Sequence, residues 1–251
     1  MSERVALISG GTRGIGRAIA ERLLTDGWQV AVCARRAPGE PVAAGGREAL
    51  FLPTDVRDPA AVEALVAATT QRLGRLDLLV NNAGGTPAVA VADASPELLE
   101  KVIALNLTAP LVLARAAYGA LREAGGSVVN IASISGLRAA PGTVAYGAAK
   151  AGLISATKGL AMEWGPDVRV NAIVIGLVEN PDQVEHYGGA AGVAQLGATL
   201  PMKRMARGHD VAACVAWLAS PEAAYVSGAA IELHGGGEIP AFLALAQDGG
   251  G

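Results

Sequence analysis

The sequence is poor in cysteine, histidine and aromatic residues, and it has no large excess of either charge. Its two cysteines, Cys33 and Cys214, sit in apolar stretches, so we expect free buried thiols rather than a disulfide or metal ligands. The three histidines (His186, His209 and His234) are scattered without metal-ligand spacing, and no metal site is expected. A formal net charge of −3, from 20 basic and 23 acidic residues, argues against nucleic acid or an anionic membrane as the main partner.

Long apolar runs and targeting signals are also lacking. No unbroken apolar run approaches the roughly 18 residues that cross a bilayer, and MSERVALISGG has no basic segment followed by a cleavable apolar one. We therefore expect a cytoplasmic protein. Hydrophobic residues make up 51% of the sequence. This suggests more apolar surface than one globule needs to bury, and it predicts a homo-oligomer, a dimer or tetramer.

Short apolar runs alternate with longer segments of helical periodicity, which is the pattern of βαβ units. The expected strands are Val5–Ser9, Trp28–Ala34, Ala49–Leu52, Leu76–Asn81, Gly126–Ala132, Val168–Val174 and Ala229–Leu233. The expected helices are Gly16–Asp26, Pro59–Leu73, Ser95–Glu123, Val144–Trp164 and His209–Leu218. The pattern predicts an α/β fold, a doubly wound Rossmann-type parallel sheet with helices on both faces, in a single domain over residues 1–251.

Two segments break this alternation. Between the second and third strands, ARRAPGEPVAAGGRE contains so much proline and glycine that a crossover helix is expected to be absent or vestigial. Residues 180–200 have weak periodicity, and they fit either a mobile lid over the site or an ordinary surface excursion. The tail after Gly235 is expected to be partly disordered at its end.

A glycine-rich turn, Ser9-Gly10-Gly11-Thr12-Arg13-Gly14-Ile15-Gly16, follows the first strand directly, and a helix begins at its end. Glycine permits positive φ there and lets backbone N–H groups approach a pyrophosphate at the positive end of the helix dipole. The spacing, G-x-x-x-G-x-G, differs from the general dinucleotide fingerprint, and a tight strand-to-helix connection without a ligand would look the same. The turn is therefore a candidate phosphate site that needs support from elsewhere.

The end of the second strand bears on the choice of dinucleotide. NAD-binding folds place an acidic residue there for the ribose 2′-hydroxyl, whereas an arginine accommodates the 2′-phosphate of NADP. This chain has Ala34-Arg35-Arg36, and Arg35 with Arg13 could clamp a phosphate by charge-assisted hydrogen bonds. NADP, as NADPH, is favoured over NAD; the alternative is that both arginines are solvated loop charges.

Tyr146 and Lys150 lie four residues apart, on one face of the helix predicted from Val144. A phenol with a pKa near 10 carries protons poorly at neutral pH, and a neighbouring ammonium is expected to lower that pKa toward the working range. This pair predicts a proton-transfer site, although alone it is a weak signal.

From about Val5 to Gly236 the sequence resembles the short-chain dehydrogenase/reductase family, in the one-domain branch that includes the 3-oxoacyl-ACP reductases. The matches come in order: the SGGTRGIG turn, Asp55-Val56, Asn81-Asn82-Ala83-Gly84, Asn106, Ser133 and the Tyr146–Lys150 pair. The resemblance implies an NADP-dependent oxidoreductase that transfers hydride between the nicotinamide and a carbonyl or secondary alcohol.

By this resemblance Ser133 would hydrogen-bond the substrate oxygen, Tyr146 would transfer the proton, and Lys150 would bond the nicotinamide ribose. Asn106 would hold a water that connects the site to solvent, although it could instead bend its helix or satisfy a backbone group. Ser135 is a rival for the role of Ser133, which we prefer because the family has the same spacing to the tyrosine. The predicted cofactor-binding residues are Gly10, Thr12, Arg13, Gly14, Ile15, Gly16, Arg35, Asp55, Val56, Asn82, Ala83, Gly84, Tyr146, Lys150 and Val178.

The chain departs from the family after the sixth strand, where a Pro-Gly pair and a later threonine are usual. Here Ile175 replaces the proline and Asn180 the threonine, while the backbone of Val178 could still bond the carboxamide. Residues 138–143 and 180–200 should line the substrate pocket, and they are mostly small or apolar. The charged, polar and aromatic exceptions include Arg138, Glu185, His186 and Tyr187.

An apolar ketone or a 3-oxoacyl thioester is the leading small-molecule substrate. The alternatives are a hydroxysteroid or other secondary-alcohol dehydrogenase working in the oxidative direction, and a non-catalytic NADP-binding scaffold. Analogy at the level of the fold does not rank the possible substrates.

Overall fold

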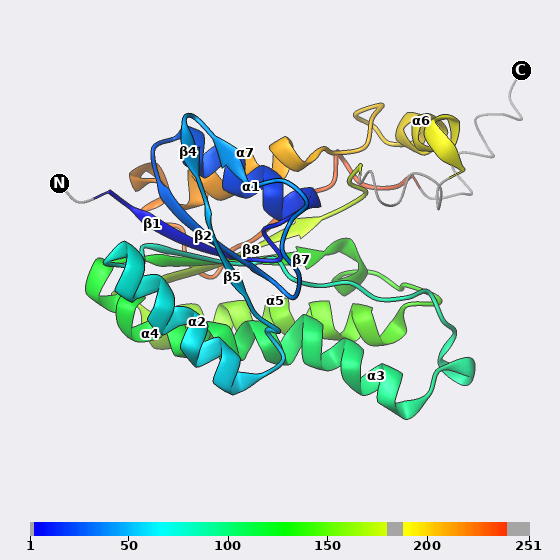
Figure 1. Ribbon diagram of the computed structural model, residues 1–251. Helices are drawn as coiled ribbons and strands as arrows, with labels where there is room; N and C mark the ends of the chain where they lie inside the picture. The colour runs from blue at the N-terminus through cyan, green and yellow to red at the C-terminus, as the bar shows by residue number, and fades with distance from the viewer. Residues whose placement is uncertain (1–2, 180–187, 240–251) are drawn as a thin grey trace, which may run out of the picture.

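The computed structural model describes residues 3–179 and 188–239, which form a seven-stranded parallel sheet between two layers of helices. The strand order is β5-β2-β1-β6-β7-β8-β9, so the chain winds outward from β1 in both directions (Figure 1). The strands are β1 (Val5–Ser9), β2 (Gln29–Ala34), β5 (Leu50–Pro53), β6 (Leu78–Asn81), β7 (Ser127–Ser133), β8 (Arg169–Ile175) and β9 (Ala230–Leu233). The prediction of a doubly wound Rossmann-type sheet is confirmed, and all seven expected strands are present.

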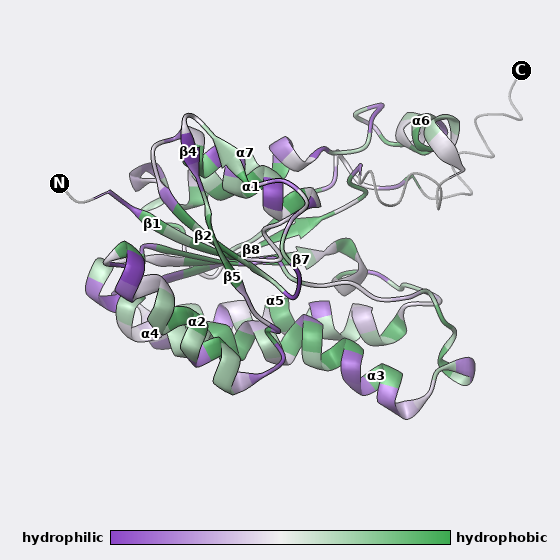
Figure 2. Cartoon of the chain, viewed as in Figure 1, coloured by the Kyte–Doolittle hydropathy of each residue, from purple (hydrophilic) through white to green (hydrophobic). Residues whose placement is uncertain are grey.

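Helices cover both faces of this sheet. Helices α1 (Gly14–Thr25) and α7 (Gly208–Leu218) pack together on one face. Helices α2 (Pro59–Leu73), α4 (Ala109–Ala124) and α5 (Val144–Trp164) cover the other. Strands β1, β6 and β7 are buried throughout, and Figure 2 shows the apolar strands between the two helix layers. The unbroken apolar strands of the sequence are therefore explained by burial on both faces.

The first break in the alternation is a β-hairpin. Strands β3 (Ala43–Ala44) and β4 (Arg47–Glu48) pair antiparallel, in place of a crossover helix between β2 and β5, as expected. Gly45 and Gly46 both have positive φ and form the turn, which an L side chain adopts only with strain. Arg17 of α1 holds the approach to the hairpin by donating to the backbone oxygens of Glu40 and Pro41.

The long helix expected over Ser95–Glu123 consists of three parts. Helix α3 (Pro96–Ile103) leads into a π-helical segment, η2 (Ala104–Thr108), which leads into α4. Among the described residues this stretch, Pro96–Ala124, is long and apolar enough to cross a membrane by length and composition, with a mean hydropathy of 1.4. Its buried residues, including Leu113, Ala117 and Leu121, pack into the core on the α2–α4 face, so it is a core helix of the fold.

The second break contains a helix that the sequence did not predict. Helix α6 (Gly189–Thr199) lies beyond the carboxyl ends of the strands, apart from the two helix layers (Figure 1). Asn180, Glu185, His186 and Tyr187, on which part of the pocket prediction rests, lie outside the described residues, as does the tail after residue 239. The shorter elements are the 3-10 turns η1 (Val91–Asp93), η3 (Ile134–Gly136) and η6 (Pro221–Ala223).

Candidate active site

The glycine-rich turn joins β1 to α1 through backbone that requires glycine at particular positions. Gly10 has a φ of 66° and Gly14 a φ of 53°, both in the left-handed region that favours glycine. A Cβ added to Gly16 would lie 2.3 Å from the carbonyl oxygen of Gly10, so the start of α1 sits directly against the turn. The turn therefore presents the N-terminus of a 12-residue helix to the cleft, an arrangement suited to a phosphate.

Side-chain hydrogen bonds tie this turn to the end of β6. The buried Ser9 hydroxyl accepts from the backbone N–H groups of Asn82 (3.0 Å) and Ala83 (3.1 Å). The Asn82 amide donates to the carbonyl oxygens of Ser9 (2.9 Å) and Gly10 (3.1 Å). Asn82 and Ala83 thus form one wall with the turn. Ser9 is a positioning residue, a role that no sequence pattern indicated.

A cleft of about 620 Å³ runs along this wall, a volume typical of small-molecule sites. The predicted cofactor residues that line it are Gly10, Thr12, Arg13, Gly14, Ile15, Arg35, Asp55, Val56, Asn82, Ala83 and Gly84. Cys33, Ala34, Thr54, Arg57, Gly85, Thr86 and Leu105 complete the lining. The structure therefore brings together at one cleft residues that the sequence scatters over more than 70 positions.

Arg57 is the charged residue of this cleft that the sequence analysis did not select. Its guanidinium donates to both oxygens of Asp55, at 2.9 and 2.5 Å, and its backbone N–H also reaches that carboxylate at 3.0 Å. These hydrogen bonds outweigh burial and lower the pKa of Asp55 to about 2, with a smaller contribution from Arg35. Among the described residues that line the cleft, Asp55 is the only carboxylate, and Arg57 holds it. The sequence signal for Arg57 was its position two residues after Asp55.

Ser133, Tyr146 and Lys150 converge at the carboxyl edge of the sheet. Ser133 ends β7, whereas Tyr146 and Lys150 lie in the first two turns of α5. The Lys150 ammonium donates to the carbonyl oxygen of Ile131 at 2.8 Å and lies 5.5 Å from the centre of the Tyr146 ring. Ser133 rather than Ser135 faces the tyrosine, because its hydroxyl hydrogen-bonds the Tyr146 phenol.

Burial shifts the pKa of both ionisable groups. Burial lowers the pKa of Lys150 to about 8, so the ammonium still outnumbers the amine by roughly ten to one at pH 7. Burial also raises the pKa of Tyr146, and the hydrogen bond with Ser133 only partly opposes it. The expected lowering of the Tyr146 pKa is therefore wrong, because desolvation of the phenolate dominates.

Asn106 lies fully buried in the π-helical segment, and its amide binds backbone. It donates to the carbonyl oxygens of Gly85 and Val102, both at 2.9 Å, and accepts from the Gly85 N–H at 3.0 Å. A Cβ added to Gly84 would lie 2.8 Å from Asn106 Oδ1 and 3.4 Å from Lys150 Nζ. The Asn106 side chain thus satisfies backbone groups and holds the loop between the cleft and Lys150, which is the alternative role named in the sequence analysis. Its role in holding a water stays a prediction.

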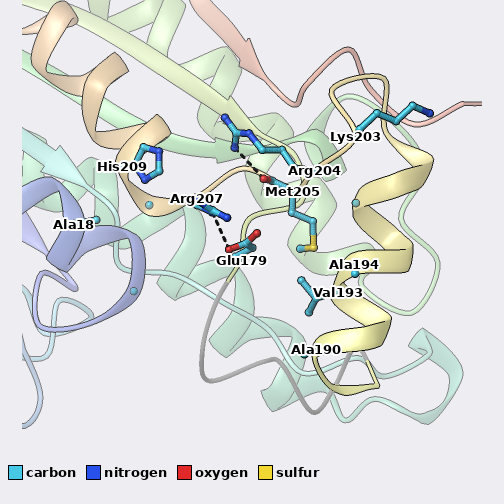
Figure 3. Close-up of a pocket in the computed structure, with 13 residues that line it drawn as sticks. Ala18, Glu179, Ala190, Val193, Ala194, Lys203, Arg204, Met205, Arg207 and His209 are labelled. Carbon is cyan, nitrogen blue, oxygen red and sulfur yellow. Dashed lines mark hydrogen bonds and ion pairs between the residues drawn. The ribbon is translucent and has the colours of Figure 1, made fainter.

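A second cavity, of about 860 Å³, lies between α6 and the N-termini of α1 and α7 (Figure 3). Gly14 lines both cavities, so the two adjoin at the glycine-rich turn. Val193 and Met205 contribute apolar surface, and Glu179 accepts a hydrogen bond from Arg207 at 3.2 Å near the centre of Figure 3. Val178, a predicted cofactor residue, is buried beside this cavity and bridges to Ala206, so its backbone is held in place.

Comparisons with known proteins agree on one family. The family model described as enoyl-(acyl carrier protein) reductase matches residues 10–238. A granaticin polyketide synthase ketoacyl reductase of Streptomyces violaceoruber is 37% identical over 94% of this chain and 96% of its own. A trans-4-hydroxycyclohexanecarboxylate dehydrogenase of Sinomonas cyclohexanicum is 36% identical over 94% of this chain and 93% of its own. The chain belongs to the short-chain dehydrogenase/reductase family.

Solved structures give the same result. An actinorhodin polyketide ketoreductase variant, determined with NADPH, superposes with a TM-score of 0.86 at 36% identity, covering 93% of this chain and 97% of its own. The short-chain dehydrogenase/reductase fold therefore accounts for nearly the whole chain, and the protein is an oxidoreductase of this family.

Proposed function

We propose that this short-chain dehydrogenase/reductase reduces a carbonyl group to a secondary alcohol with NADPH. The convergence of Ser133, Tyr146 and Lys150 beside the dinucleotide cleft carries the proposal. The cleft suits the cofactor, because the turn between Gly10 and Gly14 presents a helix N-terminus to a pyrophosphate, and a side chain at Gly16 would collide with the Gly10 carbonyl oxygen and displace this turn. A bound nicotinamide would supply the hydride; the protein's own groups hold the substrate and move the proton.

The polar groups have different tasks in this mechanism. The Ser133 hydroxyl donates to the substrate oxygen and orients the carbonyl. The Tyr146 phenol gives its proton to that oxygen as negative charge develops on it, and the raised pKa keeps the phenol protonated beforehand. The buried Lys150 ammonium stabilises the phenolate that results and would bond the nicotinamide ribose, while Asn106 keeps the neighbouring loop in place and would hold a water.

The preference for NADP over NAD rests on the charges of the cleft. Arg13 and Arg35 line it, the end of β2 carries no carboxylate, and Asp55 is already bound by Arg57. A 2′-phosphate thus meets cations rather than an uncompensated anion. Comparing KM for NADPH and NADH tests this point. Arg35→Gln should raise KM for NADPH by about tenfold or more and leave KM for NADH nearly unchanged.

Three further features belong to the proposal. Helix α6 stands over the apolar cavity beside Val178 and would act as the lid of the substrate site. Met162, Trp217 and Tyr225 are large, exposed apolar or aromatic side chains, which supports a homo-oligomer, dimer or tetramer. The free thiols Cys33 and Cys214 suit a cytoplasmic location.

The same residues would also support oxidation of a secondary alcohol, because proton and hydride transfer are reversible. The relative named trans-4-hydroxycyclohexanecarboxylate dehydrogenase favours this second candidate, whereas the two ketoreductases favour reduction. A hydroxysteroid is one alcohol of this class.

A panel of ketones, 3-oxoacyl thioesters and secondary alcohols, followed by NADPH absorbance, tests both directions. Tyr146→Phe should lower turnover by about a hundredfold or more. Unchanged turnover by that variant would support a different mechanism, and no turnover by the native protein would support an NADP-binding scaffold.

A further inference from the structure

One ion pair joins the loop that follows β7 to the segment that follows β9, at the carboxyl edge of the sheet. The Arg138 guanidinium donates to Glu238 Oε1 at 2.5 Å and to the carbonyl oxygen of Ala139 at 3.0 Å. These partners come from segments 100 residues apart in the chain. Neither residue has a part in the proposed proton transfer.

The register of the sheet places this pair close to the reacting groups. Ser133 of β7 pairs with Ile175 of β8, which pairs with Leu233 of β9, so the three form a row across neighbouring strands. The loop with Arg138 leaves from the Ser133 end of the row, and the segment with Glu238 leaves from the Leu233 end. The ion pair therefore joins the segments that follow β7 and β9, the two strands that flank β8.

The loop is short and fixed against α5. The N–H of Arg138 donates to the carbonyl oxygen of Ile134, the residue after Ser133, at 3.1 Å. This helical turn keeps the Cα atoms of Ser133 and Arg138 within roughly 10 Å of each other. A Cβ added to Gly147, next to Tyr146, would lie 2.8 Å from the carbonyl oxygen of Ser135, so the loop also rests on the catalytic helix.

Arg138 is the one charged residue in the segment 134–145, which otherwise holds small, apolar and hydroxyl side chains. Its side chain is 44% exposed and that of Glu238 is 43% exposed. An ion pair as accessible as this one contributes little to stability and exchanges readily with another anion. A guanidinium is also the side chain best suited to carboxylate or phosphate, which it can bind through two parallel N–H groups.

We propose that Arg138 binds an anionic group of the carbonyl substrate, and that Glu238 occupies this guanidinium until the substrate displaces it. The proposal rests on the proposed carbonyl reduction and narrows its substrate class. The short path from Ser133 to Arg138 suits a carboxylate on a small or cyclic ketone. A phosphate on the carrier arm of a thioester offers the guanidinium the same chemistry at a longer distance.

Paired substrates that differ only in charge test the proposal. We expect kcat/KM for 4-oxocyclohexanecarboxylate to exceed that for its methyl ester by about tenfold or more. Arg138→Gln should remove this preference through KM, leave the ester within about twofold, and retain native thermal stability. Glu238→Gln should raise kcat/KM for the acid alone, because it removes the competing carboxylate.

The second pair, acetoacetyl-CoA and the neutral acetoacetyl N-acetylcysteamine thioester, separates phosphate from carboxylate recognition. An Arg138-dependent preference within this pair alone would identify the phosphate. Arg22→Gln is the matched control, because Arg22 is also 44% exposed and lies in an ion pair, with Asp26 on α1. It should alter neither pair.

A binding measurement tests the anion site without requiring that the protein reduce a carbonyl. Cyclohexanecarboxylate has no carbonyl to reduce, and we expect Arg138→Gln to weaken its binding to the NADPH-loaded protein by about tenfold in calorimetry. The proposal would be overturned if Arg138→Gln left this binding unchanged and neither substrate pair showed a preference that depends on Arg138. If no ketone is reduced but binding depends on Arg138, carbonyl reduction fails and the anion site stands.

Discussion

Lys150 is a buried cation that should reduce the stability of the fold. Burial lowers its pKa from 10.5 to about 8, so the charged form is less stable in the folded chain by about 3 kcal/mol. Lys150→Met keeps a side chain of similar length and removes the charge. It also removes the hydrogen bond to the Ile131 carbonyl oxygen, a loss of about 1 kcal/mol. We therefore expect the cofactor-free variant to be about 1–2 kcal/mol more stable than the native chain at pH 7.

The lowered pKa of Lys150 makes the stability difference between the native chain and Lys150→Met depend on pH. Between pH 8 and 10.5 the unfolded chain binds a proton at Lys150 that the folded chain has released, so native stability rises relative to that of the variant. The raised pKa of Tyr146 acts in both proteins and largely cancels in the difference. By about pH 10.5 the advantage of Lys150→Met should have disappeared.

Urea unfolding of the two proteins at pH 7, 9 and 10.5, followed by tryptophan fluorescence, measures this difference. Lys158→Met is the control, because Lys158 lies exposed on the same helix and should change stability by no more than about 0.5 kcal/mol at any of these pH values. The reasoning is refuted if Lys150→Met is less stable than the native chain at pH 7 and the gap does not change with pH.

Three other predictions each concern a single residue. Gly84→Ala should disturb Asn106 and lower both activity and cofactor affinity, measured by kinetics and titration, because its Cβ would lie 2.8 Å from Oδ1; a fully active variant contradicts this. Lys203→Gly should raise the free energy of unfolding by about 1 kcal/mol, because Lys203 has a φ of 55°, and a lower value in urea unfolding would oppose this. Asp210→Asn should destabilise the start of α7 near pH 7 in thermal melts, because it breaks the Arg204 ion pair; the difference should vanish as pH falls from about 4 to 2, since the pKa of Asp210 is lowered to about 2.

The fold could be predicted from sequence because strands buried on both faces have unbroken apolar runs. The absence of a crossover helix could be predicted because proline and glycine disfavour a helix in residues 38–46, but the hairpin that replaces it was not predicted. Helix α6 was missed because its glycine- and alanine-rich sequence has little periodicity, and tertiary contacts such as that of Gly197 with Arg204 hold it. The direction of the Tyr146 pKa was missed because desolvation depends on the packing around the ring. The Arg138–Glu238 pair joins segments 100 residues apart, which no local pattern connects.

Hydride transfer from NADPH to a substrate carbonyl is the central claim. It is tested most directly with NADPH that carries deuterium at C4, prepared in each configuration and incubated with an accepted ketone. The account predicts deuterium at the carbinol carbon from one configuration only, formed about a hundredfold more slowly by Tyr146→Phe. An alcohol without deuterium from either configuration, or a Tyr146→Phe variant as fast as the native protein, would contradict it.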